Sequence, residues 1–204
     1  MSPHWMHELH SNLAMFSAYG GMSDPGLSSV GAHGLDMLVN LQVAISFFWD
    51  DPRIYNAASY LVFALLLLVW VYVTLRSHPS PARTWLALAA IAALSMLPVY
   101  HRQHDAKLLL LTVPACAMLW AEGGLTGRLA LLVTTAGFVL NGDFFWVIVL
   151  DFISRLHLPA TALTRQVVIA VQVFPAPLIL LVMSVFYLWV YVRSCSVHAP
   201  SQPL

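Results

Sequence analysis

Charged residues are scarce in this chain: Asp, Glu, Lys and Arg together make up 9% of its 204 residues. A soluble domain carries about 25% charged residues, and only about 45–50% of its residues are apolar. Here 60% of the residues are hydrophobic and the mean hydropathy is +0.78. The formal net charge is zero, so no basic surface for nucleic acid is indicated. The composition excludes an ordinary soluble domain and predicts a polytopic membrane protein.

Cysteine is also scarce, with Cys116 in an apolar segment and Cys195 near the C-terminal end. Nothing in their positions pairs them, so the sequence predicts no disulfide framework and leaves the redox compartment open. A signal peptide is missing as well, because residues 1–34 contain no basic segment followed by an apolar core. These residues are polar and rich in glycine, which is typical of an extramembrane loop within a longer protein. We therefore expect the chain to be a fragment.

Long apolar runs dominate the rest of the chain and predict an all-α membrane bundle over residues 35–193. The run 54–75 is long enough, at about 1.5 Å per residue, to cross a hydrocarbon core of about 30 Å. Pro175 and Pro177 predict a kink in the last run. The five predicted transmembrane helices are about 54–75, 85–100, 106–121, 128–150 (interrupted at 141–143) and 166–192, followed by a disordered polar tail at 194–204.

An apolar segment that is too short to span, residues 35–49, precedes the first span and contains Asn40 and Gln42. Its length predicts a re-entrant or interfacial helix. The two amide side chains have two interpretations: they hydrogen-bond a sugar, or they pair with the backbone of a broken helix. Asp143, which follows Asn141-Gly142 in the fourth span, also has two interpretations: it is a functional carboxylate, or it marks a capped helix boundary.

The most polar segment beside a span is residues 100–107 (YHRQHDAK), which we call the polar knot. It holds two of the nine basic residues, one of the nine acidic residues and two histidines. Charge at a membrane boundary is costly unless it is paired, hydrated or bound to a ligand. Arg102 offers a planar fork that suits phosphate, and His101 can donate a hydrogen bond or a proton. The polar knot therefore predicts an anion clamp; the alternative is a snorkelling, self-neutralising interfacial turn.

A metal site is a further interpretation of the same segment. His101, His104 and Asp105 share one face of an α-helical turn and are residue types that bind metals. A second histidine group near the N-terminus consists of His4, His7 and His10. It lacks the two-residue gap of the zinc-protease motif H-E-x-x-H and is more typical of a solvated or interfacial face. We therefore predict neither a metal site nor a cofactor.

The threading of the predicted spans places the loops at 76–83 and 122–128 on one membrane face, and the polar knot and Asp143 on the other. Four basic residues lie on the first face and five on the second, so the positive-inside rule does not decide the orientation. Acidic residues accompany the basic ones mainly on the second face, which favours a cytoplasmic first face and an outward polar knot. Arg83, in the first loop, is expected to face bulk water without a partner.

The segment LSMLPVYHRQHDAKLLLLTVPACAMLWAEGG resembles bacterial glycosyltransferase family 87 proteins, also described as a domain of unknown function. The family pattern is a Leu-Pro-Val-Tyr-His-Arg run, two further residues, then Asp and an apolar helix. The residues that match it are Tyr100, His101, Arg102 and Asp105. His104 departs from the pattern, since an aromatic residue is expected there. The stretch VNLQVAISFFWDDPRIYNAASYLV adds lesser matches at Asn40, Gln42, Asp51 and Arg53, and the likeness runs through most of residues 1–195.

The resemblance implies a GT-C membrane enzyme that moves a hexose from a polyprenyl-phosphate donor to a lipid or glycan acceptor. Such enzymes lie in the bacterial inner membrane with the site facing the periplasm, and their catalytic aspartate lies in an outward loop near the N-terminus. This chain resembles the C-terminal half, so no catalytic residue is assigned, and the N-terminal half, the donor and membrane lipid are the expected partners. The expected donor-phosphate residues are His101, Arg102 and Lys107, supported by Tyr100, Asp105, Asn40, Gln42 and Asp143.

A second class of function fits the same composition. The chain is then a small non-enzymatic membrane protein that binds a lipid head group or scaffolds a partner. A transporter is a third class, but the sequence contains no internal repeat of the kind that many transporter folds show.

Overall fold

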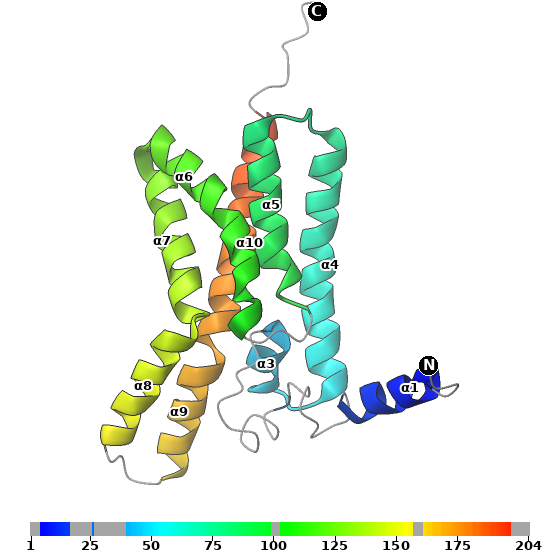
Figure 1. Ribbon diagram of the computed structural model, residues 1–204, viewed down its shortest axis with the longest axis vertical. Coiled ribbons are helices and arrows are strands. Elements are labelled where there is room, and N and C mark those ends of the chain that lie inside the picture. Colours follow the sequence, from blue (N-terminus) through cyan, green and yellow to red (C-terminus); the bar gives the residue numbers. More distant parts are fainter. Residues whose placement is uncertain (1–4, 17–25, 27–39, 99–102, 157–160, 197–204) are drawn as a thin grey trace, which may run out of the picture.

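The computed structural model describes residues 5–16, 26, 40–98, 103–156 and 161–196, and these ranges contain helices and turns but no strand. The tall helices in Figure 1 are α4 (Pro52–Arg76), α5 (Pro81–Ser95), α6 (Thr112–Glu122), α7 (Gly124–Leu140) and α10 (Pro175–Ser196). Below them lie α3 (Leu41–Ser46), α8 (Asp143–Arg155), α9 (Ala162–Val173) and, to one side, α1 (Trp5–Phe16). The predicted all-α class is confirmed for this part of the chain.

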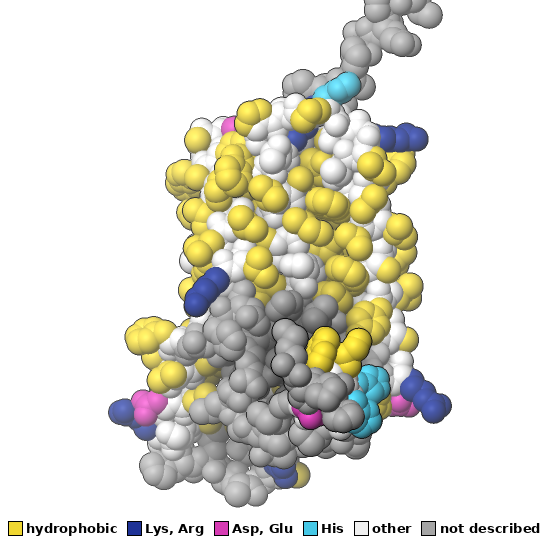
Figure 2. Space-filling view, turned by 45° about the vertical axis from the view of Figure 1, so that its right-hand side comes forward, with side chains coloured by type: hydrophobic (Ala, Val, Ile, Leu, Met, Phe, Trp, Pro, Cys, Tyr) yellow, Lys and Arg dark blue, Asp and Glu magenta, His cyan; other side chains and the backbone are white. Residues whose placement is uncertain are grey.

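Two helices are long and apolar enough to cross a membrane: Pro52–Arg76, which is α4, and the nearly continuous Ala162–Cys195, which joins α9 and α10. A third crossing results if α7 and α8, which are bent by 63° relative to one another, form one broken span. Figure 2 shows hydrophobic side chains over the flank of the bundle, with most of the charged side chains towards its two ends. This distribution suits a bundle whose sides face lipid.

The other two predicted spans contain shorter helices. α5 ends at Ser95, and the segment 106–121 divides into a 3₁₀ helix, η1 (Gln103–Leu111), and the α-helix α6 of 11 residues. Pro114 lies close to the change in helix type. It has no N–H to donate to the Leu110 carbonyl, and proline is tolerated in an α-helix only within the first turn, where α6 places it. The total of five spans stays a prediction.

The boundaries of α4 follow from residues that end a helix. The Asp51 carboxylate accepts a hydrogen bond from the Arg53 N–H at 2.9 Å, and Pro52 occupies the first helical turn. At the other end the Ser77 N–H closes the last turn on the Val73 carbonyl. Asp51 and Arg53 therefore have a local structural role at the start of this helix.

The centre of the bundle lies between α5 and α10. Ala89 and Ala93 of α5 are completely buried, and their small side chains allow the two helices to approach closely. The hydroxyl of Tyr187 on α10 forms a buried hydrogen bond with Thr134 on α7. Lipid offers no hydrophobic drive for helix association, so close packing and bonds of this kind hold such a bundle together.

Two breaks occur where the sequence predicts them. The fourth predicted span is interrupted at Asn141-Gly142, where the Asn141 side-chain amide donates to the Gly137 carbonyl at 2.8 Å. The last one is interrupted at Phe174, immediately before Pro175. From there α10 continues to Ser196, into the residues expected to form the polar tail.

Candidate functional site

The start of α3 is fixed beside the end of α5. Asn40 caps the helix, because its Oδ1 accepts a hydrogen bond from the Val43 N–H at 3.1 Å. The Leu41 N–H donates to the Leu97 carbonyl at 3.0 Å. Leu97 lies in the chain just before the polar knot, so the amide side chains of α3 and the entrance to the polar knot lie at one end of the bundle. We call this the α3 end.

Buried polar groups gather on α3 and the neighbouring turns of α4. The Gln42 side-chain amide donates to the Asn56 Oδ1 at 2.7 Å and joins the two helices. Asn40 and Ser59 are 1% and 0% exposed, and the Asn40 Nδ2 and the Ser59 hydroxyl have no hydrogen-bond partner among the residues that the structure describes. An unsatisfied buried donor costs about 1–3 kcal/mol, so groups of this kind are candidates for contact with a polar ligand.

Asn40 and Gln42 use their side-chain amides in different ways. Asn40 pairs with the backbone through its Oδ1, as the broken-helix interpretation expects, while its Nδ2 remains unpaired. Gln42 donates to the side chain of Asn56. The α3 end therefore combines a helix cap, an inter-helix amide bond and free donors.

The polar knot is described only in part. Outside the described residues lie Tyr100, His101 and Arg102, together with the side chains of Gln103, His104, Asp105 and Asp143. Lys107 is exposed on η1, which packs against α5. Asp143 is the first residue of α8. The anion clamp stays a prediction.

The histidine groups give no metal centre within the described ranges, where no three His, Cys, Asp or Glu side chains lie close enough to hold an ion. His7 and His10 are exposed on α1. His4 and His101 lie outside the described residues.

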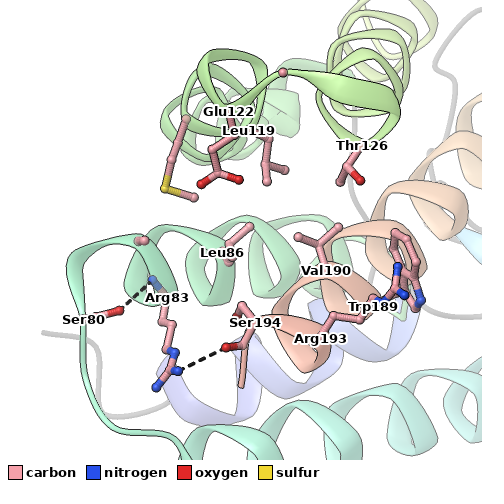
Figure 3. Close-up of a pocket in the computed structure, with 13 residues that line it drawn as sticks. Ser80, Arg83, Leu86, Leu119, Glu122, Thr126, Trp189, Val190, Arg193 and Ser194 are labelled. Carbon is pink, nitrogen blue, oxygen red and sulfur yellow. Dashed lines mark hydrogen bonds between the residues drawn. The ribbon is translucent and has the colours of Figure 1, made fainter. Parts of the chain in front are cut away.

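A cleft of about 640 Å³ lies at the opposite end of the bundle (Figure 3). Its walls come from the first turns of α5, the α6–α7 turn and the last turns of α10, and we call this the cleft end. Arg83 is half-buried there, and its guanidinium donates to the His78 carbonyl and to the Ser194 carbonyl, each at 3.1 Å. The expectation that Arg83 faces bulk water is wrong, because the end of α10 packs beside it, while its partners among the described residues are backbone carbonyls and no charged group.

Two further charged residues line the cleft. The Arg193 guanidinium lies over the Trp189 ring, 4.8 Å from its centre. Glu122, at the end of α6, lies on the opposite wall from Arg83 (Figure 3). Among the residues that the structure describes, Arg83, Arg193 and Glu122 form no ion pair with one another or with any other side chain.

The sequence does not single out these three residues, because they lie on three different helices far apart in the chain. The available signal is weaker: each stands at a helix end, and the threading of the predicted spans puts all of them on one face. Only the packing of α10 against α5 and α7 brings them together.

No family model, curated protein or solved structure matches this chain.

Proposed function

We propose that this chain is the C-terminal part of a membrane glycosyltransferase that moves a hexose from a polyprenyl-phosphate donor to a lipid or glycan acceptor. The observation that supports the proposal is the bond between the Leu41 N–H and the Leu97 carbonyl. It joins the two segments on which the family resemblance rests: the stretch with Asn40 and Gln42, and the stretch that leads into the polar knot.

The chemistry assigns separate tasks to the two segments. In an inverting transfer the acceptor oxygen attacks C1 of the sugar, the C1–O bond to phosphate breaks, and a base takes the acceptor proton. The departing lipid phosphate carries the negative charge, which Arg102 stabilises with its planar fork and His101 and Lys107 support with further donors. The unpaired amide of Asn40 is a donor for a sugar hydroxyl. The base belongs to the N-terminal half, so this part alone does not complete the reaction.

Binding of the donor's lipid phosphate tests the proposal without the missing half. The purified chain in detergent should bind a polyprenyl phosphate about tenfold or more tighter than the uncharged polyprenol of the same length. Arg102→Ala should remove most of this preference. The matched control is Arg76→Ala. Arg76 is an exposed arginine in the last turn of α4, outside the polar knot. Equal binding of the two lipids would overturn the clamp.

A sugar-transfer assay tests the fragment part of the proposal. The chain alone should show no transfer from a labelled polyprenyl-phosphate sugar. Turnover by residues 1–204 would mean that the catalytic base lies within this chain and not in the proposed N-terminal half. The gene gives a second test. A reading frame that continues upstream of Met1 and encodes an outward loop with an Asp would support the glycosyltransferase.

The second candidate is a non-enzymatic membrane protein that binds a lipid head group. The observation that favours it is the cleft at the other end of the bundle, which is lined by charged and apolar side chains and by none of the described residues of the polar knot. A start codon preceded by a ribosome site immediately before Met1 supports this candidate.

A further inference from the structure

The cleft end is a separate candidate site, independent of the proposed donor site. Its volume of about 640 Å³ falls within the range of about 300–1,000 Å³ that is usual for small-molecule sites. The lower wall in Figure 3 comes from α5 and α10, and the upper wall from the α6–α7 turn. Helix ends of this kind lie at the level of lipid head groups when a bundle spans a membrane.

The arginines of the cleft are held in place but keep free donors. Arg83 uses two of its N–H groups on the His78 and Ser194 carbonyls, and a guanidinium has five. The ring of Trp189 supports the Arg193 guanidinium from one side. Both arginines therefore line the cleft without a carboxylate partner among the described residues, Arg83 with its guanidinium towards Ser194 and Arg193 with its guanidinium beside Trp189 (Figure 3). Guanidinium donors of this kind suit a phosphate group.

Glu122 determines what kind of phosphate compound fits. A carboxylate on the opposite wall repels a ligand that carries only negative charge, and it attracts a cation. A primary ammonium satisfies this carboxylate best, since its N–H groups donate hydrogen bonds that a trimethylammonium group cannot form.

The apolar part of the cleft indicates how the ligand is anchored. Leu86, Met118, Leu119 and Val190 line the cleft together with the charged residues. An amphiphile can place its first methylene groups against these side chains while its head group meets the arginines and Glu122. A soluble compound would leave this apolar lining uncovered.

We propose that the cleft between α5, the α6–α7 turn and α10 binds the head group of a phosphoethanolamine lipid. Arg83 and Arg193 hold the phosphate, Glu122 accepts hydrogen bonds from the ammonium, and the apolar lining receives the start of the acyl chains.

Competition between lipids tests this assignment. The purified chain is mixed in detergent with phosphatidylethanolamine, phosphatidylglycerol and phosphatidylcholine of identical acyl chains, and the bound lipid is counted by native mass spectrometry. We expect a preference of about three- to tenfold for phosphatidylethanolamine, since each partly exposed ion pair contributes modestly. Equal occupancy by all three lipids would overturn the proposal. If free phosphoethanolamine at the same concentration displaced the bound lipid, the acyl chains would contribute nothing and the assignment of a lipid as the ligand would be wrong.

Variants of the cleft test the roles of its carboxylate and its arginines one at a time. Glu122→Gln should abolish the preference for phosphatidylethanolamine over phosphatidylglycerol, because it removes both the attraction of the ammonium and the repulsion of an anionic head group. Arg193→Gln should weaken binding of both lipids, and this residue is a safer test than Arg83, which also ties α5 to α10. The matched control is Arg128→Gln, an exposed arginine on α7 that does not line the cleft. An unchanged preference in Glu122→Gln contradicts the assignment.

Discussion

The two ends of the bundle handle polar groups in opposite ways. At the α3 end the buried polar side chains are neutral, and Asn40 and Gln42 are used in a helix cap and an inter-helix bond, while Asp51, Arg53 and Lys107 lie exposed. At the cleft end the polar side chains are charged, lie at helix ends and form no ion pairs among the described residues. Neutral amides can be buried in an apolar bundle at a moderate cost, whereas charges must stay near water or a ligand. The buried amides therefore serve mainly the fold, whereas the charged groups of the cleft keep donors and an acceptor for a ligand.

The largest effect should come from the polar knot. In the proposed full-length glycosyltransferase, Arg102→Ala should lower sugar transfer about 10²–10³-fold, which is the usual loss for one charge-stabilising donor in a preorganised site. Arg102→Lys should restore only part of the activity, because an ammonium keeps the charge but lacks the planar fork. The measurement is transfer from a labelled lipid donor in membranes, normalised to folded protein. Wild-type activity in Arg102→Ala would reduce the polar knot to an interfacial turn.

The cleft end can be altered without touching its charges. A Cβ on Gly127 would meet the carbonyl oxygen of Leu119, a backbone atom that cannot move without shifting α6. Gly127→Ala should therefore separate α6 from α7 and destabilise the chain by about 1–3 kcal/mol, as overpacking does elsewhere. Thermal unfolding in detergent measures the change. Gly123→Ala is the control. Gly123 has a positive φ, which strains any other residue, but a Cβ there would meet no neighbour, so this variant measures backbone strain without a clash. A Gly127→Ala protein as stable as wild type would contradict the packing of α6 on α7.

A smaller effect is expected from the amide pair that joins α3 to α4. Gln42→Leu should destabilise the chain by about 1 kcal/mol, because it removes a part-buried hydrogen bond and leaves the Asn56 Oδ1 unpaired. The double variant Gln42→Leu/Asn56→Leu should lose less than the sum of the two single variants. Strict additivity in this cycle would show that the two amides do not interact.

The smallest effect is expected where a charge has only a surface contact. Arg76 at the end of α4 is exposed and lies over the ring of Tyr72, with 4.5 Å from its guanidinium carbon to the ring centre. Arg76→Gln should change the free energy of unfolding by no more than about 0.5–1 kcal/mol. A loss as large as that of Gly127→Ala would mean that this arginine has a partner inside the protein.

Sequence patterns predicted the fold best where the stop signals are local. The predicted span 54–75 nearly coincides with Pro52–Arg76, because Asp51, Pro52 and Ser77 mark the ends of this helix. The third predicted span was less accurate: hydropathy does not distinguish the 3₁₀ helix η1 from an α-helix, and Pro114 was not used as a boundary.

For the α3 end and the cleft end, too, the sequence indicated residue types but not their partners on other helices. The amides of α3 stand out as polar residues in an apolar segment, so the sequence named Asn40 and Gln42 as candidates, and their role in a site stays a prediction. The partners of Gln42 and Arg83 were not found, since Asn56 and Ser194 reach them only after α3 packs on α4 and α10 on α5. A single sequence contains residue types but not the distances between helices.

The central claim is that the polar knot and the cleft face opposite sides of the membrane. Cysteine accessibility tests it most directly, in a chain in which Cys116 and Cys195 are replaced by serine and single cysteines are introduced as His78→Cys, Gln103→Cys or His198→Cys. An impermeant thiol reagent should label positions 78 and 198 from one side and position 103 only from the other. Labelling of position 103 from the same side as position 78 would contradict the arrangement of the two ends.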